Sequence, residues 1–272
     1  MSVGAVLAVA RVEWSKLAAQ VKVRLLFAVC IAGPFIFAAA MRVQSNAPAD
    51  TLFGRTVAES GFAIPLVVLG FSALWPLAVV GSLVGGDVFA AEDRYGTWTN
   101  VLTRSRSRTE VFVGKVLLAL SFSVVAVAVL GVSSVGAGLL VIGQQPLIGL
   151  SGLLLLPPEA FVRVALAWLS IVPPTLGFTA LAILASVATR SSAAGIGIPV
   201  LAGLIMQLAA FVDGPETARQ LLIANAFGAW HGLFTEPRYY RPLAYGTAVS
   251  VTYVVVSIGL AYGMFRHREI GR

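Results

Sequence analysis

The sequence predicts an all-α polytopic membrane protein: six transmembrane helices, an N-terminal interfacial helix, and a cytosolic helix between the second and third spans. Three observations predict this fold class. Hydrophobic residues make up 58% of the chain and charged residues only 11%, whereas an ordinary soluble domain carries about 25% charged residues. Six apolar runs approach the roughly 20 residues that a helix needs to cross a bilayer. The charged residues gather in short clusters beside those runs. We therefore treat residues 1–272 as one membrane domain.

Residues 1–24 predict the interfacial helix. Charged side chains from Arg11 to Arg24 alternate with apolar ones, and Trp14 lies among them. Tryptophan and basic residues prefer the boundary between lipid and water. The alternative is a polar extension of the first span.

The six spans are read from the apolar runs as residues 25–41, 61–84, 116–142, 164–188, 193–211 and 245–265. The apolar stretch 148–156 is too short to cross and ends in Pro157-Pro158, so it is interpreted as a loop rather than a seventh span. The pair Pro173-Pro174 predicts a sharp break in the fourth span, because proline removes a backbone donor.

The distribution of basic residues predicts the orientation. With the N-terminus inside, 13 of the 19 Lys and Arg residues fall on the inner side. Inner loops of membrane proteins are enriched in Lys and Arg. Both termini and residues 87–115 are therefore expected in the cytosol.

The longest outer loop covers residues 213–242 and contains an apolar stretch, 221–234. This stretch is too short to span the bilayer. One interpretation is a re-entrant hairpin buried by other protein segments. The other is an aromatic belt at the outer interface.

The sequence also excludes several kinds of chemistry. Gly114-Lys115 is followed by Val116 and lacks the first glycine of a phosphate-binding loop, so this chain is not expected to bind ATP by that route. His231 and His267 are far apart, Cys30 lies in an apolar run, and no metal-site spacing occurs.

The pI of about 10.1 does not indicate nucleic-acid binding, because the basic residues flank apolar runs. The spans hold almost no ionisable groups, which disfavours an ion-coupled transporter.

Residues 92–108 form a polar island between two apolar runs. Gly96 should end the helix that leaves the second span, and Thr97 can cap a short new one. That helix would present Trp98, Val101 and Leu102 on one side, followed by alternating arginines. Such an exposed helix suits a groove on a partner protein. The simpler interpretation is a solvated loop that only sets orientation.

The order Glu92, Gly96-Thr97, Leu102-Thr103, Arg108 and Gly114-Lys115 resembles the segment after the second span in ABC-2-type permeases, the membrane subunits of ABC exporters. The six-span layout, the N-terminal helix and the basic tail are also similar. Two positions depart from the family pattern: Arg94, often acidic there, and Ser105, often proline.

The resemblance implies a half-transporter in the bacterial cell membrane that pairs with a second permease subunit, identical or homologous. Two separate ABC ATPase subunits, which carry ATP and Mg²⁺, would dock on the cytosolic helix, making it a coupling helix. This chain would have no enzymatic activity or cofactor of its own. The expected docking residues are Glu92, Gly96, Thr97, Trp98, Val101, Leu102, Thr103 and Arg108.

An apolar transport path suits hydrophobic or amphipathic substrates. Phe71, Trp75 and Gln207 are candidate cavity residues, because a tryptophan at mid-membrane needs a partner for its N–H. The alternative for the two aromatic residues is plain helix packing, and for Gln207 a hydrogen bond between helices. The alternative function is a membrane-embedded sensor or assembly protein without transport.

Overall fold

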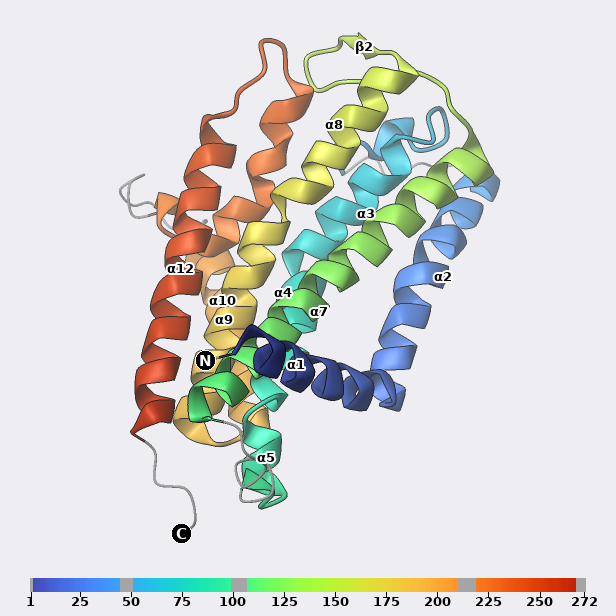
Figure 1. Cartoon of the computed structure of the whole chain (residues 1–272). Coiled ribbons are helices and arrows are strands. Elements are labelled where there is room, and N and C mark those ends of the chain that lie inside the picture. Colours follow the sequence, from blue (N-terminus) through green and yellow to red (C-terminus); the bar gives the residue numbers. More distant parts are fainter. Residues whose placement is uncertain (1, 45–50, 99–106, 210–218, 268–272) are drawn as a thin grey trace.

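The computed structural model describes residues 2–44, 51–98, 107–209 and 219–267 (Figure 1). Most helices run side by side as a bundle, and α1 (Val3–Ala18) crosses one end of it. We call this the α1 end. The opposite end carries a short hairpin of β1 (Leu147–Ile148) and β2 (Leu154–Leu155), and we call it the hairpin end.

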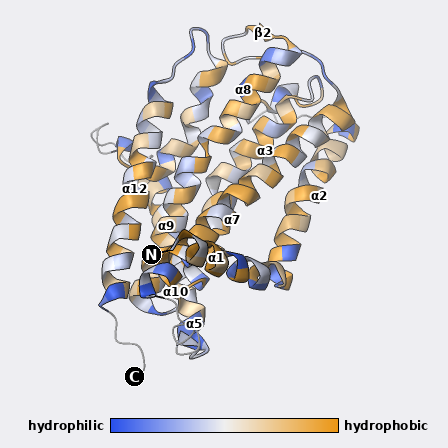
Figure 2. Ribbon diagram, viewed as in Figure 1, coloured by the Kyte–Doolittle hydropathy of each residue, from blue (hydrophilic) through white to orange (hydrophobic). Residues whose placement is uncertain are grey.

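The helix α1 is separate from α2 (Val21–Val43). The chain breaks at Ala19 and Gln20, and the two helices run in clearly different directions (Figure 1). Residues 3–18 therefore form a helix of their own rather than an extension of the first span, whereas residues 21–24 begin α2. Hydropathy is high along the bundle, and hydrophilic residues concentrate towards its two ends (Figure 2). This pattern is the one expected for helices that cross a lipid layer.

Four helical stretches of the described chain are long and apolar enough to cross a membrane: α2, residues 108–142, residues 157–189, and α12 (Arg241–Arg266). The stretch 108–142 joins α7 (Arg108–Ala137) to a π-helical turn, η2 (Gly138–Ile142). A bent pair of shorter helices makes a fifth candidate. The predicted fifth span, 193–211, is represented by α10 (Ser192–Leu208), a shorter apolar helix. The structure thus supports an all-α membrane protein with four or five candidate spans.

The sharpest break lies in the second predicted span, not in the fourth. Helices α3 (Ala63–Leu74) and α4 (Pro76–Asp87) meet at Trp75 with a bend of 57°. Pro76 begins α4, where its missing N–H needs no partner, so it ends one helix and starts another.

The predicted break at Pro173-Pro174 is present but is not sharp. Helix α8 (Pro157–Ser170) is interrupted only at Ile171 before α9 (Val172–Thr189) begins. The two prolines occupy the first turn of α9, where the helix tolerates them. Residues 157–189 still qualify as a single span.

The stretch 148–156 is a loop as predicted, closed by the β1–β2 pair, which aligns Leu147 with Leu155. Gly152 has φ +81°, a left-handed conformation that glycine adopts without a steric cost.

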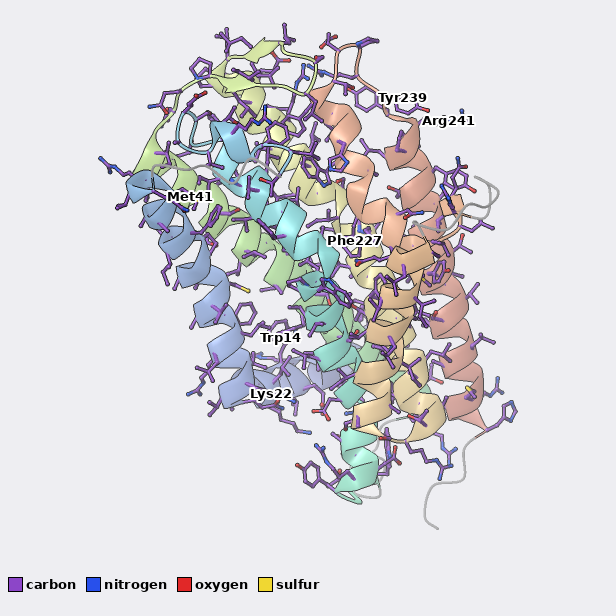
Figure 3. All side chains as sticks on the ribbon, turned by 180° about the vertical axis from the view of Figure 1, so that it is seen from behind. Trp14, Lys22, Met41, Phe227, Tyr239 and Arg241 are labelled. Atoms are coloured by element: carbon purple, nitrogen blue, oxygen red, sulfur yellow. The ribbon has the colours of Figure 1, made fainter. Side chains whose placement is uncertain are left out.

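The apolar stretch of the long outer loop forms a 3₁₀ helix, η4 (Ile223–Phe234). It packs against α8, α10 and α12, and Phe227 points into the bundle (Figure 3). Phe227, Trp230 and Phe234 are all buried. Phe53, which precedes the short helix η1 (Gly54–Thr56), contacts Trp230 and Phe234. An aromatic belt facing lipid is therefore contradicted, because these rings face protein.

Candidate functional site

The candidate site lies at the α1 end, where α5 (Ala90–Arg94) follows α4 (Figure 1). Gly96 ends this short helix with φ +61°, as the sequence predicts. The backbone N–H of Thr97 then donates to the carbonyl oxygen of Glu92 at 3.0 Å. The Thr97 hydroxyl also donates to Oε2 of Glu92. Thr97 thus folds the chain back onto Glu92.

Lys115 on α7 is the centre of the site. Its Nζ lies 2.9 Å from Oε1 of Glu92, 3.2 Å from Oε2 of Glu13 on α1, and 3.0 Å from the carbonyl oxygen of Val88. The Lys115 side chain is 1% exposed. An ammonium group has three N–H donors, and here each has an acceptor. A buried charge of this kind is tolerated only when it is paired and hydrogen-bonded.

Burial raises the pKa of Glu92, but the charge of Lys115 and the hydrogen bond from Thr97 outweigh it, so the net pKa lies below the ordinary value for Glu. The carboxylate form is therefore the stable one at neutral pH.

Asp87 forms a second polar cluster at the end of α4. Its carboxylate accepts from Ser192 Oγ at 2.7 Å and from Lys22 Nζ at 2.9 Å, and Arg94 lies 3.5 Å away. Burial raises the pKa of Asp87, whereas these partners lower it, with a net value below the ordinary one. The cluster joins α2, α4, α5 and α10. Lys22 lies at the base of α2 (Figure 3).

Trp98 is buried, which corrects the expectation of an exposed anchor. Its side chain is 6% exposed, its ring contacts Phe89 and Phe265, and Nε1 donates to Oδ1 of Asp93 at 2.9 Å. An indole ring gains more by filling this aromatic pocket than by facing water. Val101, Leu102 and Thr103 lie outside the described residues, and of the predicted helix only Trp98 is described.

Arg108 also turns towards its own chain. It opens α7, and its Nη1 donates to the carbonyl oxygen of Arg266 at 3.3 Å, near the end of α12. Ser107, the residue before it, and Glu110 in the first turn form a reciprocal cap that fixes the start of α7. Of the expected docking residues, the structure brings together Glu92, Gly96, Thr97 and Trp98, while Arg108 bonds the last turn of α12.

A crevice of about 910 Å³ lies between α1, α4, α5 and α7. Glu13, Lys16, Asp87, Glu92 and Lys115 line it, with apolar residues of the same helices. The sequence interpretation missed the part played by Glu13 in this cluster and gave Lys115 no role beyond its motif. One signal was available: Lys115 is a lone charge in the long apolar stretch that follows Glu110.

Of the three candidate cavity residues, Phe71 lies in an apolar groove of the described chain, about 310 Å³ in volume, between α2, α3, α4 and α7. Trp75 and Gln207 are not among the residues of that groove. Phe71 and Trp75 are 52% and 40% exposed. In the part of the chain that the structure describes, no group of His, Cys, Asp and Glu side chains could hold a metal ion.

A bundle of long apolar helices with charged residues gathered at its ends is the architecture of a multi-pass membrane protein. Residues 9–206 match a family model described as ABC-2 family transporter protein, and the chain belongs to this family. No curated protein matches the chain.

Proposed function

We propose that this chain is the membrane-spanning permease subunit of an ATP-driven exporter. A separate ATPase subunit, in two copies, binds ATP and Mg²⁺ and docks at the α1 end. A second permease subunit, identical or homologous, completes the transport path. The chain itself carries no catalytic group in this scheme.

The observation that carries the proposal is the conformation of residues 87–98 in a chain of this family. The segment leaves the bundle at the α1 end, and Tyr95 is 69% exposed at its tip. Ion pairs of Glu92 with Lys115 and of Asp87 with Lys22 fix its base to α7 and α2. Lys115 also pairs with Glu13 on α1, and the Ser192 hydroxyl on α10 donates to Asp87. A force applied to this tip reaches the helices through bonded contacts rather than through a loose loop.

In this proposal the α1 end faces the cytosol of a bacterial cell, and α1 lies in the headgroup region. The bent pair α3–α4 and the helix α10 complete six spans. Arg11, Lys16, Lys22 and Arg24 cluster at this end, as the enrichment of basic residues on the inner side requires.

Hydrophobic or amphipathic molecules are the proposed substrates. Several buried hydroxyl groups inside the bundle are already hydrogen-bonded: the hydroxyls of Ser123 and Thr179 lie 2.8 Å apart, and Ser82 donates to the carbonyl of Ala78. These groups are engaged and do not offer a path for a charged substrate.

A membrane-embedded sensor or assembly protein without transport is the competing function. The test is purification of the tagged full chain from its native membranes. We expect an ATPase with a phosphate-binding loop to co-purify at one copy per permease chain, and the complex to hydrolyse ATP. A chain that purifies without any ATPase contradicts the proposal and favours the sensor.

The docking surface is tested with two exposed tyrosines at opposite ends of the bundle. Tyr95→Ala removes an exposed aromatic side chain at the α1 end, and Tyr239→Ala removes one at the hairpin end, where the ring is 52% exposed (Figure 3). Loss of an aromatic interface anchor costs about 2 kcal/mol or more, so Tyr95→Ala should reduce ATPase co-purification about tenfold or more. Tyr239→Ala should leave it unchanged.

A further inference from the structure

The helix α1 packs a side chain directly against the backbone of α7. A β-carbon at Gly114 would lie 2.6 Å from Cγ1 of Val9 on α1, so only glycine allows this contact. Trp14 of α1 also donates from Nε1 to Oγ of Ser121 on α7 at 3.0 Å. Because Gly114 brings α1 this close, the next residue, Lys115, can reach a carboxylate on α1.

Lys115 joins two carboxylates that belong to different elements. Glu13 is on α1, Glu92 is on α5, and their side chains are 12% and 10% exposed. The third acceptor, the carbonyl of Val88, lies just before α5. Without the ammonium group between them, two poorly hydrated carboxylates would face the same space, which is strongly unfavourable.

We propose that Lys115 is a positioning residue that fastens α1 to α5, so that the interfacial helix and the segment carrying Tyr95 move as one body. The inference rests on the proposed function in one respect: the movement is driven by an ATPase docked on that segment. The link itself is a property of this chain alone. Because of this link, the part of the chain that moves includes not only the five-residue helix α5 but also α1, and α1 leads directly into α2.

The ring of Trp98 completes the link on the side of α5. The Lys115 Nζ lies 5.9 Å from the centre of the Trp98 ring, within the range of an attraction between a cation and an aromatic face. Trp98 in turn contacts Phe265 near the end of α12. Lys115 therefore touches groups from both ends of the segment 92–98.

Hydrogen exchange of the full chain in bilayer discs of phosphatidylethanolamine and phosphatidylglycerol tests the link. Lys115→Met keeps the length of the side chain but removes the charge. We expect exchange to rise in both α1 and α5, about tenfold or more, because loss of a buried ion-pair partner leaves uncompensated charge. Lys115→Arg should restore most of the protection.

A second variant keeps the test valid if Lys115→Met does not fold. Glu13→Gln leaves the bonds of Lys115 to Glu92 and Val88 in place. Exchange should then rise in α1 but not in α5. The matched control is Lys16→Gln, the neighbouring cation on α1, which pairs with Glu13 at 2.8 Å but is 55% exposed. It should leave both helices unchanged, because exposed ion pairs contribute little.

ATP hydrolysis by the purified complex tests the transmission. At equal ATPase content, Glu13→Gln should lower hydrolysis about fivefold or more, whereas Lys16→Gln should match the wild type. Unchanged protection of α1 in both Lys115→Met and Glu13→Gln overturns the link. Unchanged hydrolysis in Glu13→Gln overturns the transmission. Failure of the wild-type chain to capture an ATPase contradicts the proposed function but leaves the exchange test intact.

Discussion

Gly86 on α4 and Gly195 on α10 bring the backbones of these two helices into direct contact. A β-carbon at Gly86 would lie 2.5 Å from the carbonyl carbon of Gly195, and one at Gly195 would lie 2.5 Å from the carbonyl oxygen of Gly86. The neighbouring bond from Ser192 to Asp87 holds the same crossing. Small residues at helix crossings allow this close packing in membrane proteins.

Gly86→Ala and Gly195→Ala should each destabilise the protein by about 1–3 kcal/mol, because the added methyl group forces the helices apart. Gly197→Ala is the matched control in α10, since a β-carbon there meets nothing within 4 Å. It should be neutral or slightly stabilising. Thermal unfolding in detergent measures all three, and equal midpoints for Gly195→Ala and Gly197→Ala would contradict the crossing.

Much of the fold follows from the hydrophobic pattern. The long apolar runs at 25–41, 116–142 and 245–265 appear as α2, α7 with η2, and α12. A continuous apolar segment in lipid must form a helix, because the helix satisfies every backbone hydrogen bond within the segment. Pro76, like the other prolines of the spans, is expected to kink its helix, but the sequence does not indicate that the sharpest bend lies there. Pro76 and Pro173 both lie in the first turn of a new helix, and only packing makes the chain bend by 57° before Pro76 while residues 157–189 stay a single span.

The candidate site was predicted less completely. Gly96 and Thr97 turn the chain as expected, because their conformational and bonding preferences are local. The burial of Trp98 and the role of Glu13 could not be predicted, since both depend on contacts across long sequence separations. Glu13 meets Lys115 about 100 residues along the chain, and no local pattern encodes that pairing.

The proposed orientation predicts the labelling of two introduced cysteines. In a Cys30→Ser background, Tyr95→Cys should react with an impermeant thiol reagent only from the cytosolic side, and Tyr239→Cys only from outside. Both tyrosines are exposed, at opposite ends of the bundle. The reverse labelling would overturn the orientation drawn from the basic residues.

Arg163 should stabilise the hairpin end. Its side chain is 3% exposed, Nη1 donates to the carbonyl oxygen of Leu233 at 2.8 Å, and Nη2 lies 2.6 Å from Oε1 of Glu159. Arg163→Met should lower stability by about 1–3 kcal/mol, because it leaves the buried carbonyl at the end of η4 without a donor. Arg238→Gln, which removes an exposed partner of the same Glu159, should cost less than about 1 kcal/mol. Equal losses in the two variants would contradict a special role for Arg163.

Acid should loosen the α1 end. The folded pKa values of Asp87 and Glu92 lie below the ordinary 3.8 and 4.5, so their ion pairs contribute fully above pH 4.5 and are lost as the pH falls through the lower folded values. The contribution of these two carboxylates to thermal stability should be constant from neutral pH to 4.5 and then decline. The double variant Asp87→Asn, Glu92→Gln should start lower and show a shallower decline, whereas Glu59→Gln, at an exposed position, should follow the wild type. An identical acid decline in the double variant would show that other groups cause it.

Trp75 at the bend between α3 and α4 should affect transport more than assembly. Its side chain is 40% exposed, so packing within this chain does not account for it, and in the proposed complex it faces the path between two permease subunits. Trp75→Ala should change the stimulation of ATP hydrolysis by hydrophobic and amphipathic test compounds about fivefold or more, since an aromatic contact in a binding site contributes about 1–2 kcal/mol. Basal hydrolysis and ATPase co-purification should stay as in the wild type.

Phe161→Ala, which removes a 50% exposed aromatic side chain from α8, is the control for a lipid-facing ring. If both variants respond alike to every compound, or if Trp75→Ala fails to assemble, Trp75 serves packing rather than substrate contact.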